Sequence, residues 1–232
     1  MKNLTIFLIA SVLLTCTKRP GEEIIMNEIP GIKGICIYHD CPLREKPQNE
    51  SEFLTTLYLG DEIRFLGEVK TDVNNEYYKV ELYDGTLGWL EKKAVLFNAR
   101  QAAVVTRSSL YQQINKLEIK ELILNPAEFV AIIGEEGEWV KVLGANRTKS
   151  GWMKREYLSL EDEDVFIATL AYSDLLDENG EIIEKQLPYF IHSLPDKNAP
   201  LALQLQNILE EQVADAIAES ILEYELGYSE ED

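Results

Sequence analysis

The chain repeats itself at an offset of about sixty residues, and this duplication constrains its architecture more than any other feature. Residues 76–80 read EYYKV and residues 138–142 read EWVKV, a separation of 62 positions. Residues 84–90 (DGTLGWL) and 150–153 (SGWM) share a Gly-Trp pair, and these two tryptophans are 63 positions apart. A pattern that occurs twice in one chain indicates two copies of one structural unit.

A strand-like segment precedes each copy of this pattern, at residues 61–68 and 127–135. Short runs of β-branched and aromatic residues separated by Gly, Asn and Asp are typical of antiparallel strands joined by tight turns. Strands this short and closely spaced favour a small barrel. We therefore predict a mainly β fold with two tandem small barrels, at residues 31–97 and 98–160, followed by an α/β extension at residues 161–232.

The order of these features resembles that of bacterial SH3-like domains. That order is a strand, a Gly-Asp or Gly-Glu turn, an aromatic-x-Lys-Val segment, a polar hairpin and a Gly-Trp pair. Residues 41–47 (CPLREKP) are similar to a shortened form of the family's Leu-x-Val-Arg opening, and residues 105–108 are the nearest equivalent in the second copy. The resemblance covers residues 31–160 and implies two SH3-like barrels in tandem.

The resemblance also implies where a ligand would bind. The family's ligand shelf falls on Trp139 and Tyr157 in the second copy, but on Tyr77 and Ala94 in the first, where one aromatic wall is missing. Aromatic rings on such a shelf stack on peptide or sugar. We expect the second barrel to bind a peptidoglycan fragment or another envelope protein, with Trp139, Tyr157 and Tyr77 as candidate contacts. A solvated or interdomain position for these rings is the alternative.

The tryptophan of each Gly-Trp pair has a structural explanation. Trp89 and Trp152 lie on the last long strand of each copy, where a bulky residue fills a small barrel. No proline follows Trp152 at the position that lines the proline-peptide groove of eukaryotic relatives. We therefore do not expect a proline-rich ligand.

The N-terminus has the features of a bacterial lipoprotein signal peptide. Residues 1–15 have a short basic start and an apolar stretch too short to cross a bilayer, and residues 13–16 (LLTC) resemble a lipobox in which the Cys16 sulfur receives a lipid. Thr15 departs from the usual Gly, Ala or Ser, and an ordinary secretory leader is the alternative. We expect residues 16–30 to be a lipidated tether in the bacterial cell envelope, at the outer membrane or cell surface rather than the inner membrane.

Two cysteines and a histidine lie within the six residues 36–41. Export to an oxidising compartment favours a Cys36–Cys41 disulfide. Two unpaired thiols are an alternative, because a bridge between residues so close in sequence requires a tight turn. A zinc or copper site that includes His39 is a third interpretation. A closed structural site needs four ligands, however, and no cysteine follows Cys41 to complete the set. We predict no metal site and no cofactor.

The C-terminal third carries most of the net charge. Residues 161–232 contain nineteen acidic residues against two lysines, and so account for −17 of the total formal charge of −19. An acidic surface repels phosphate backbones. The charge therefore argues against nucleic acid as a partner and favours basic partners.

Three segments of this extension have recognisable patterns. Residues 165–172 (VFIATLAY) fit a strand or a helix, and we favour a strand. Apolar residues at helical spacing predict an amphipathic helix over residues 200–226, with its acidic face outward and its apolar face packed across one or both barrels. Docking of this helix against another protein is the alternative. Asn179-Gly180 predicts a type I′ turn.

The sequence offers few residues for a familiar catalytic centre. It has two histidines, and its three cysteines all lie at or before Cys41. A Cys-His peptidase needs a cysteine nucleophile in a catalytic domain, and no cysteine lies in a separate domain that could serve as one. We therefore expect that the chain is not an enzyme but a lipid-anchored, non-catalytic binding protein of the cell envelope. The alternatives are a structural or assembly subunit that docks a basic partner through its acidic C-terminal helix, and a surface adhesin.

Overall fold

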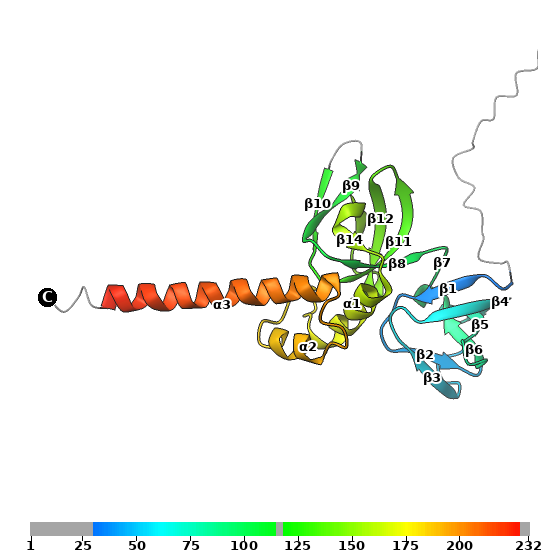
Figure 1. The fold of residues 1–232 in the computed structure, drawn as a ribbon. Coiled ribbons are helices and arrows are strands. Elements are labelled where there is room, and N and C mark those ends of the chain that lie inside the picture. The colour runs from blue at the N-terminus through cyan, green and yellow to red at the C-terminus, as the bar shows by residue number, and fades with distance from the viewer. Residues whose placement is uncertain (1–29, 115–117, 228–232) are drawn as a thin grey trace, which may run out of the picture.

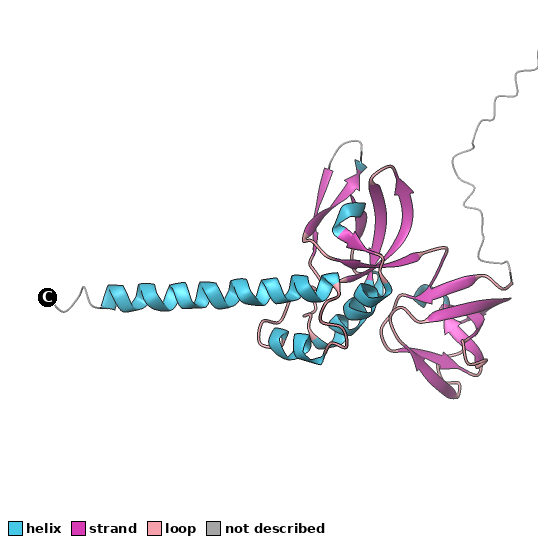
Figure 2. Cartoon of the chain, viewed as in Figure 1, coloured by secondary structure: helices cyan, strands magenta, loops and turns pink. Residues whose placement is uncertain are grey.

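The computed structural model describes residues 30–114 and 118–227. Two seven-stranded antiparallel sheets come first along the chain, and three α-helices follow them (Figures 1 and 2). The fold is thus mainly β with a helical C-terminal part, which confirms the predicted fold class. Among the helices of the described residues, none combines the length and hydropathy that crossing a membrane requires.

The first sheet is built from residues 33–97. Its strands pair in the order β3-β2-β6-β5-β4-β1-β7. Their bounds are β1 (Lys33–Cys36), β2 (Cys41–Arg44), β3 (Phe53–Leu57), β4 (Glu62–Asp72), β5 (Asn75–Glu81), β6 (Leu87–Glu91) and β7 (Val95–Phe97), with the 3-10 turn Lys92–Ala94 before β7. Its core contains Phe65, Tyr78, Val80 and Leu90, each at most 2% exposed.

The second sheet has the same strand order one copy further along, β10-β9-β13-β12-β11-β8-β14. Its strands are β8 (Arg100–Val104), β9 (Ser108–Gln113), β10 (Glu118–Leu124), β11 (Phe129–Glu136), β12 (Trp139–Gly144), β13 (Ser150–Lys154) and β14 (Leu158–Ser159). Tyr77 faces Glu91 across β5 and β6, and Trp139 faces Lys154 across β12 and β13. The sequence repeat therefore corresponds to a repeated strand order, and Tyr77 and Trp139 occupy equivalent positions.

The glycine of each Gly-Trp pair allows a neighbouring strand to pack closely. A Cβ atom on Gly88 would lie 2.5 Å from the Leu43 Cγ atom, and one on Gly151 would lie 2.8 Å from the Leu110 Cβ atom. Both leucines are fully buried in their barrel cores. Glycine at these two positions thus lets a buried leucine fill the barrel, which explains why the pair recurs.

The segment predicted as a strand at residues 165–172 is instead helical. It belongs to α1 (Asp162–Asp174), whose Ile167, Ala168 and Ala171 are buried against the second barrel. These positions share one helix face, and the small alanines allow close packing. Three acidic residues in the first turn suit the positive end of the helix dipole. The strand prediction was therefore wrong.

The remaining helices are α2 (Leu187–Ser193) and α3 (Pro200–Gly227). Leu201, Ala202 and Leu205 of α3 are buried in the core that α1 and α2 share with the barrels. Beyond this first part, Val213 and Ile217 are 52% and 55% exposed, and the helix extends away from the barrels (Figure 1). The beginning of α3 packs mainly on α1 and α2, so the prediction that this helix packs across one or both barrels was wrong.

A buried ion pair within the second barrel also contacts the loop between α1 and α2. The Lys149 ammonium lies 2.7 and 2.9 Å from the two Glu128 carboxylate oxygens, and their side chains are only 13% and 11% exposed. The same ammonium donates to the Asn179 carbonyl at 2.7 Å. Burial is the main reason why the pKa of Glu128 lies above its ordinary value, with Lys149 opposing that rise.

The loop at Asn179 turns as predicted but with a different geometry. Gly180 has φ of +80°, whereas Asn179 does not enter the left-handed region that both residues of a type I′ turn require. A Cβ atom on Gly180 would lie 2.5 Å from the Glu128 carboxylate carbon. The glycine is thus needed for its backbone angle and for the close approach of the loop to Glu128.

Asn146 holds both barrels and α1 together. Its N–H donates to the Ile37 carbonyl at 2.8 Å, and its side-chain oxygen accepts from the His39 N–H at 3.1 Å. Its amide nitrogen donates to the Tyr172 hydroxyl of α1 at 2.5 Å. Next to it, the Arg147 guanidinium donates to the Lys93 carbonyl at 2.6 Å. These contacts set the position of the first barrel relative to the second.

Candidate functional site

An exposed aromatic pair lies at one end of the second barrel. Trp139 is the first residue of β12 and points outward, while Val140 and Val142 on the opposite face of that strand are fully buried. The Tyr111 ring of β9 meets the Trp139 ring edge to face, with centroids 5.2 Å apart and planes at 84°. Both side chains are half-buried. The Trp139 ring is therefore held in place by its neighbour and still presents surface to solvent.

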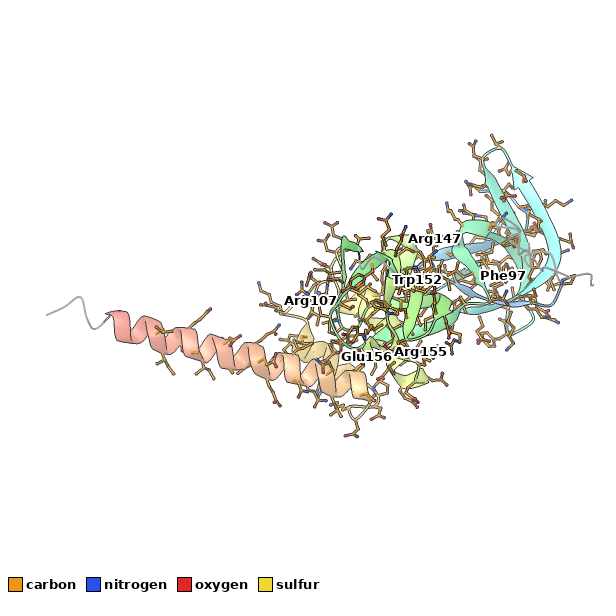
Figure 3. All side chains as sticks on the ribbon, turned by 90° about the horizontal axis from the view of Figure 1, so that it is seen from above. Phe97, Arg107, Arg147, Trp152, Arg155 and Glu156 are labelled. Carbon is orange, nitrogen blue, oxygen red and sulfur yellow. The ribbon has the colours of Figure 1, made fainter. Side chains whose placement is uncertain are left out.

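A pocket of about 450 Å³ lies beside this pair, lined by Gly137, Glu138, Lys154, Arg155 and Glu156. The Lys154 ammonium is 6.0 Å from the centroid of the Trp139 ring, a cation–π arrangement. It also lies 3.6 Å from the Glu138 carboxylate and 3.8 Å from the Glu156 carboxylate. Figure 3 shows Arg155 and Glu156 side by side on the second barrel. The pocket lining thus carries charges of both signs, and its Lys154 ammonium also contacts the Trp139 ring.

Tyr157 ends the 3-10 turn Arg155–Tyr157, next to this pocket in sequence. Its half-buried ring packs against the core of the second barrel. In the part of the chain that the structure describes, the ring that contacts Trp139 is that of Tyr111. Tyr111 faces Trp152 across two paired strands, and Arg44 faces Trp89 in the same way in the first barrel. Because the equivalent residue in the first barrel is an arginine, comparing the two copies gave no sign of an aromatic contact at Tyr111.

The first barrel does not place Tyr77 on an open face. Tyr77 is 1% exposed, and its hydroxyl donates to the Asn49 side-chain oxygen at 2.9 Å. Asn49 belongs to the connection between β2 and β3, which covers the ring. Ala94, at the position of Tyr157, is also buried. The proposal of Tyr77 as a ligand contact is therefore corrected: the residue is part of the interior.

The two tryptophans of the Gly-Trp pairs differ in burial. Trp89 is 8% exposed, in line with the packing role that we predicted, and Lys79 places its ammonium 5.9 Å from the ring centroid. Trp152 is only half-buried. Its position between Lys141 and Tyr111 puts it on the outer face of the second barrel, so the packing prediction fits Trp89 better than Trp152.

Cys36 and Cys41 are buried free thiols rather than the disulfide that an exported chain led us to expect. Their side chains are hydrogen-bonded to each other, which lowers the pKa of Cys36 and raises that of Cys41. The His39 ring instead contacts the rings of Tyr58 and Tyr172, with centroids 5.6 and 5.3 Å away. Within residues 30–114 and 118–227, no three His, Cys, Asp or Glu side chains are grouped as metal ligands.

The predicted lipidation site lies outside the described residues. Cys16 precedes residue 30, at which the description begins. The signal peptide and the tether lie in the same part of the chain, so their assignment stays a prediction.

Comparison with known proteins identifies a family for part of the chain. Residues 41–95 match the bacterial SH3 domain family, so the first barrel is a bacterial SH3 domain. No curated protein matches the chain significantly.

Several solved structures are similar to the chain. Two are NlpC1 and NlpC2 from Trichomonas vaginalis, with 11% and 12% identity, TM-scores of 0.26 and 0.25, and coverage of 56% and 64% of this chain. Another is a novel NlpC/P60 endopeptidase from Photobacterium damselae subsp. piscicida, with 13% identity, a TM-score of 0.24 and coverage of 60%. The chain spans 46%, 57% and 37% of the lengths of these three structures.

These similarities correct the expectation of a non-catalytic protein. The similar structures are of NlpC proteins, one of them described as an endopeptidase. The assignment as a non-catalytic envelope protein, with its alternatives of an assembly subunit or an adhesin, is therefore withdrawn. At TM-scores of 0.24 to 0.26 the likeness assigns no activity to this chain. The family comparison supports a bacterial SH3 domain at residues 41–95.

Proposed function

We propose that this chain binds peptidoglycan of the bacterial cell wall through the pocket beside Trp139. Bacterial SH3 domains generally bind peptidoglycan, and residues 41–95 form one. The second barrel repeats the strand order of that domain, and on this basis we propose that it is a second SH3 domain. The aromatic shelf lies on the second barrel, because Tyr77 of the first barrel is buried.

One observation carries this proposal: the half-buried Trp139 ring is braced by Tyr111 next to a pocket of about 450 Å³. A ring fixed by a neighbouring ring loses little conformational freedom when a ligand stacks on it. Sugar rings and peptide planes both present flat faces to such a surface. The cations Lys154 and Arg155 can pair with carboxylates of the wall peptide, and the Glu138 and Glu156 carboxylates can accept hydrogen bonds from its hydroxyl and amide groups.

The test is sedimentation of the chain from residue 17 onward with purified, insoluble peptidoglycan. We expect the protein to move into the pellet as peptidoglycan is added, and soluble wall fragments to release it. A protein that stays in the supernatant at all peptidoglycan concentrations contradicts the proposal. Unrelated insoluble polysaccharide, such as cellulose, is the control for trapping in the pellet.

We further propose that Cys16 carries the lipid that places this surface in the cell envelope. Support comes from residues 13–16, whose order resembles a lipobox. Stable anchoring requires more than one acyl chain, which lipoprotein processing supplies. Mass spectrometry of the N-terminal peptide from bacterial membranes is expected to show a chain that begins at Cys16 with a diacylglycerol mass on sulfur. A chain that begins elsewhere, or an unmodified Cys16, contradicts this assignment.

A further inference from the structure

A second cavity, of about 580 Å³, lies between the first barrel, the start of the second and α1. The first barrel contributes Tyr58 and Asp61 from the turn between β3 and β4, and Glu62 from the start of β4. Arg100 comes from the start of β8, and Asp162 and Phe166 come from the first two turns of α1. The contacts of Asn146 with the first barrel and with α1 fix these walls relative to one another.

Two aromatic rings in this cleft are available to a ligand. Tyr58 is 49% exposed and Phe166 is 50% exposed. Phe166 is not needed for the packing of α1, because the buried face of that helix is formed by Asp164, Ile167, Ala168 and Ala171. The floor of the cleft is apolar, with Ile35 and Leu59 buried beneath it. A flexible aliphatic chain would therefore find apolar surface both below it and beside it.

The charge of the cleft is negative. Three carboxylates line it, from Asp61, Glu62 and Asp162, and Arg100 is the cation among its lining residues. The Arg100 guanidinium is already bound to the Glu135 carboxylate. Asp61 uses one oxygen to accept from the Tyr58 N–H at 2.8 Å, and Glu62 has only a solvent-exposed contact of 3.4 Å with Lys33. The carboxylates thus retain the capacity to bind a cation.

The cleft is a neighbour of the pocket beside Trp139. One oxygen of the Glu135 carboxylate binds Arg100, which lines the cleft, and the other binds Arg155, which lines the Trp139 pocket. A chain of two ion pairs, Arg100-Glu135-Arg155, therefore connects the lining of one cavity to that of the other. A chain-like ligand that occupies one cavity can extend across this Arg-Glu-Arg group into the other.

We propose that the cleft is a second subsite that binds a peptide segment with a protonated, lysine-like amine. The methylene stem of such a side chain lies against the Tyr58 and Phe166 rings, and its ammonium binds the carboxylates at the mouth of the cleft. The inference rests on the proposed wall-binding function, because it assigns the amine-bearing segment of the wall peptide to this cleft and leaves the adjoining part of the polymer to the pocket beside Trp139.

The test uses two blocked tripeptides, acetyl-Ala-Lys-Ala-amide and the same peptide with Nε-acetyl-lysine, titrated into the full chain at low ionic strength. Backbone amide NMR signals report the site. We expect the lysine peptide to shift the signals of Gly60 and Thr169 and the acetylated peptide to bind about fivefold more weakly, the upper range for an exposed ion pair. Equal binding of both peptides, or no shifts at the cleft, overturns the inference.

Variants on α1 make the test specific. Phe166→Ala and Asp162→Asn are each expected to weaken binding of the lysine peptide about threefold to fivefold. Asp174→Asn, exposed at the other end of α1, and Tyr189→Ala, 79% exposed on α2, are matched controls that leave it unchanged. Cleft variants that bind like these controls overturn the inference. The peptide titration tests only this inference. The proposed wall-binding function is tested separately, by sedimentation of the unaltered chain with peptidoglycan.

Discussion

Replacing Lys149 with alanine is expected to lower the free energy of unfolding by about 3 kcal/mol at pH 7, because it leaves a buried carboxylate without its counterion. The Glu128 side chain is only 11% exposed, and without Lys149 it keeps the Asn125 N–H, at 2.8 Å, as its hydrogen-bond partner. The variant also removes the hydrogen bond from Lys149 to the Asn179 carbonyl. Both effects loosen the loop between α1 and α2 from the second barrel.

The loss should depend on pH in a direction that follows from the pKa of Glu128. Burial raises this pKa above the ordinary value of 4.5, so the folded state holds the Glu128 proton more tightly than the unfolded state does. Stability from this group is therefore complete below pH 4.5 and is lost as pH rises through the folded pKa. In the wild type, Lys149 lowers the pKa of Glu128. Removing Lys149 therefore raises the pKa of Glu128 further. The variant should thus lose more stability than the wild type between pH 4 and pH 7.

Chemical denaturation at pH 4 and pH 7 measures this effect. Arg107→Ala is the matched control, because Arg107 pairs with Glu181 of the same loop at 3.8 Å but both side chains are more than half exposed. An exposed pair of this kind contributes at most about 1 kcal/mol. The account of the ion pair is wrong if Lys149→Ala costs no more than Arg107→Ala at pH 7, or if its cost does not fall at pH 4.

The repeat predicted the architecture because its residues determine strand packing directly. The Gly-Trp pairs mark the places where Leu43 and Leu110 approach a strand too closely for any side chain. Alternating buried residues such as Val140 and Val142 define the inner face of each strand. These are local requirements, and so they are visible in the sequence.

The segment at residues 165–172 could not be assigned from its apolar pattern, since a buried helix of small residues and a strand look alike over eight positions. The acidic residues Asp162, Glu163 and Asp164 just before it are a helix-start signal that would have favoured α1. The three-way contact at Asn146 had no sequence signal, because it depends on how separate domains dock.

The candidate site shows a similar limit. Tyr77 and Trp139 occupy equivalent positions, yet Tyr77 is buried because the connection that contains Asn49 covers it. A repeat comparison cannot detect a loop that covers one copy. Tyr111 escaped the same comparison because its counterpart is Arg44. The second barrel was thus predicted as the binding barrel, but one of its two aromatic walls was identified only in the structure.

Replacing Trp139 with alanine is expected to weaken binding to peptidoglycan about thirtyfold, equivalent to ~2 kcal/mol, the usual cost of removing a central aromatic contact. The substitution removes both the exposed face and the edge-to-face contact that holds the Tyr111 ring. Trp139→Phe keeps an aromatic ring at this position and should bind within about threefold of the wild type, because an aromatic face remains available for stacking. Thermal unfolding of both variants separates lost binding from lost folding.

The most direct test of the proposed function compares four proteins in the peptidoglycan sedimentation assay: the wild type, Trp139→Ala, Trp139→Phe and Tyr189→Ala. Tyr189 is a solvent-exposed aromatic residue on α2, away from both cavities, and controls for general loss of aromatic surface. We predict that the wild type, Trp139→Phe and Tyr189→Ala move into the pellet at similar peptidoglycan concentrations, while folded Trp139→Ala requires about thirtyfold more peptidoglycan. Sedimentation of Trp139→Ala at the wild-type concentration would contradict the central claim.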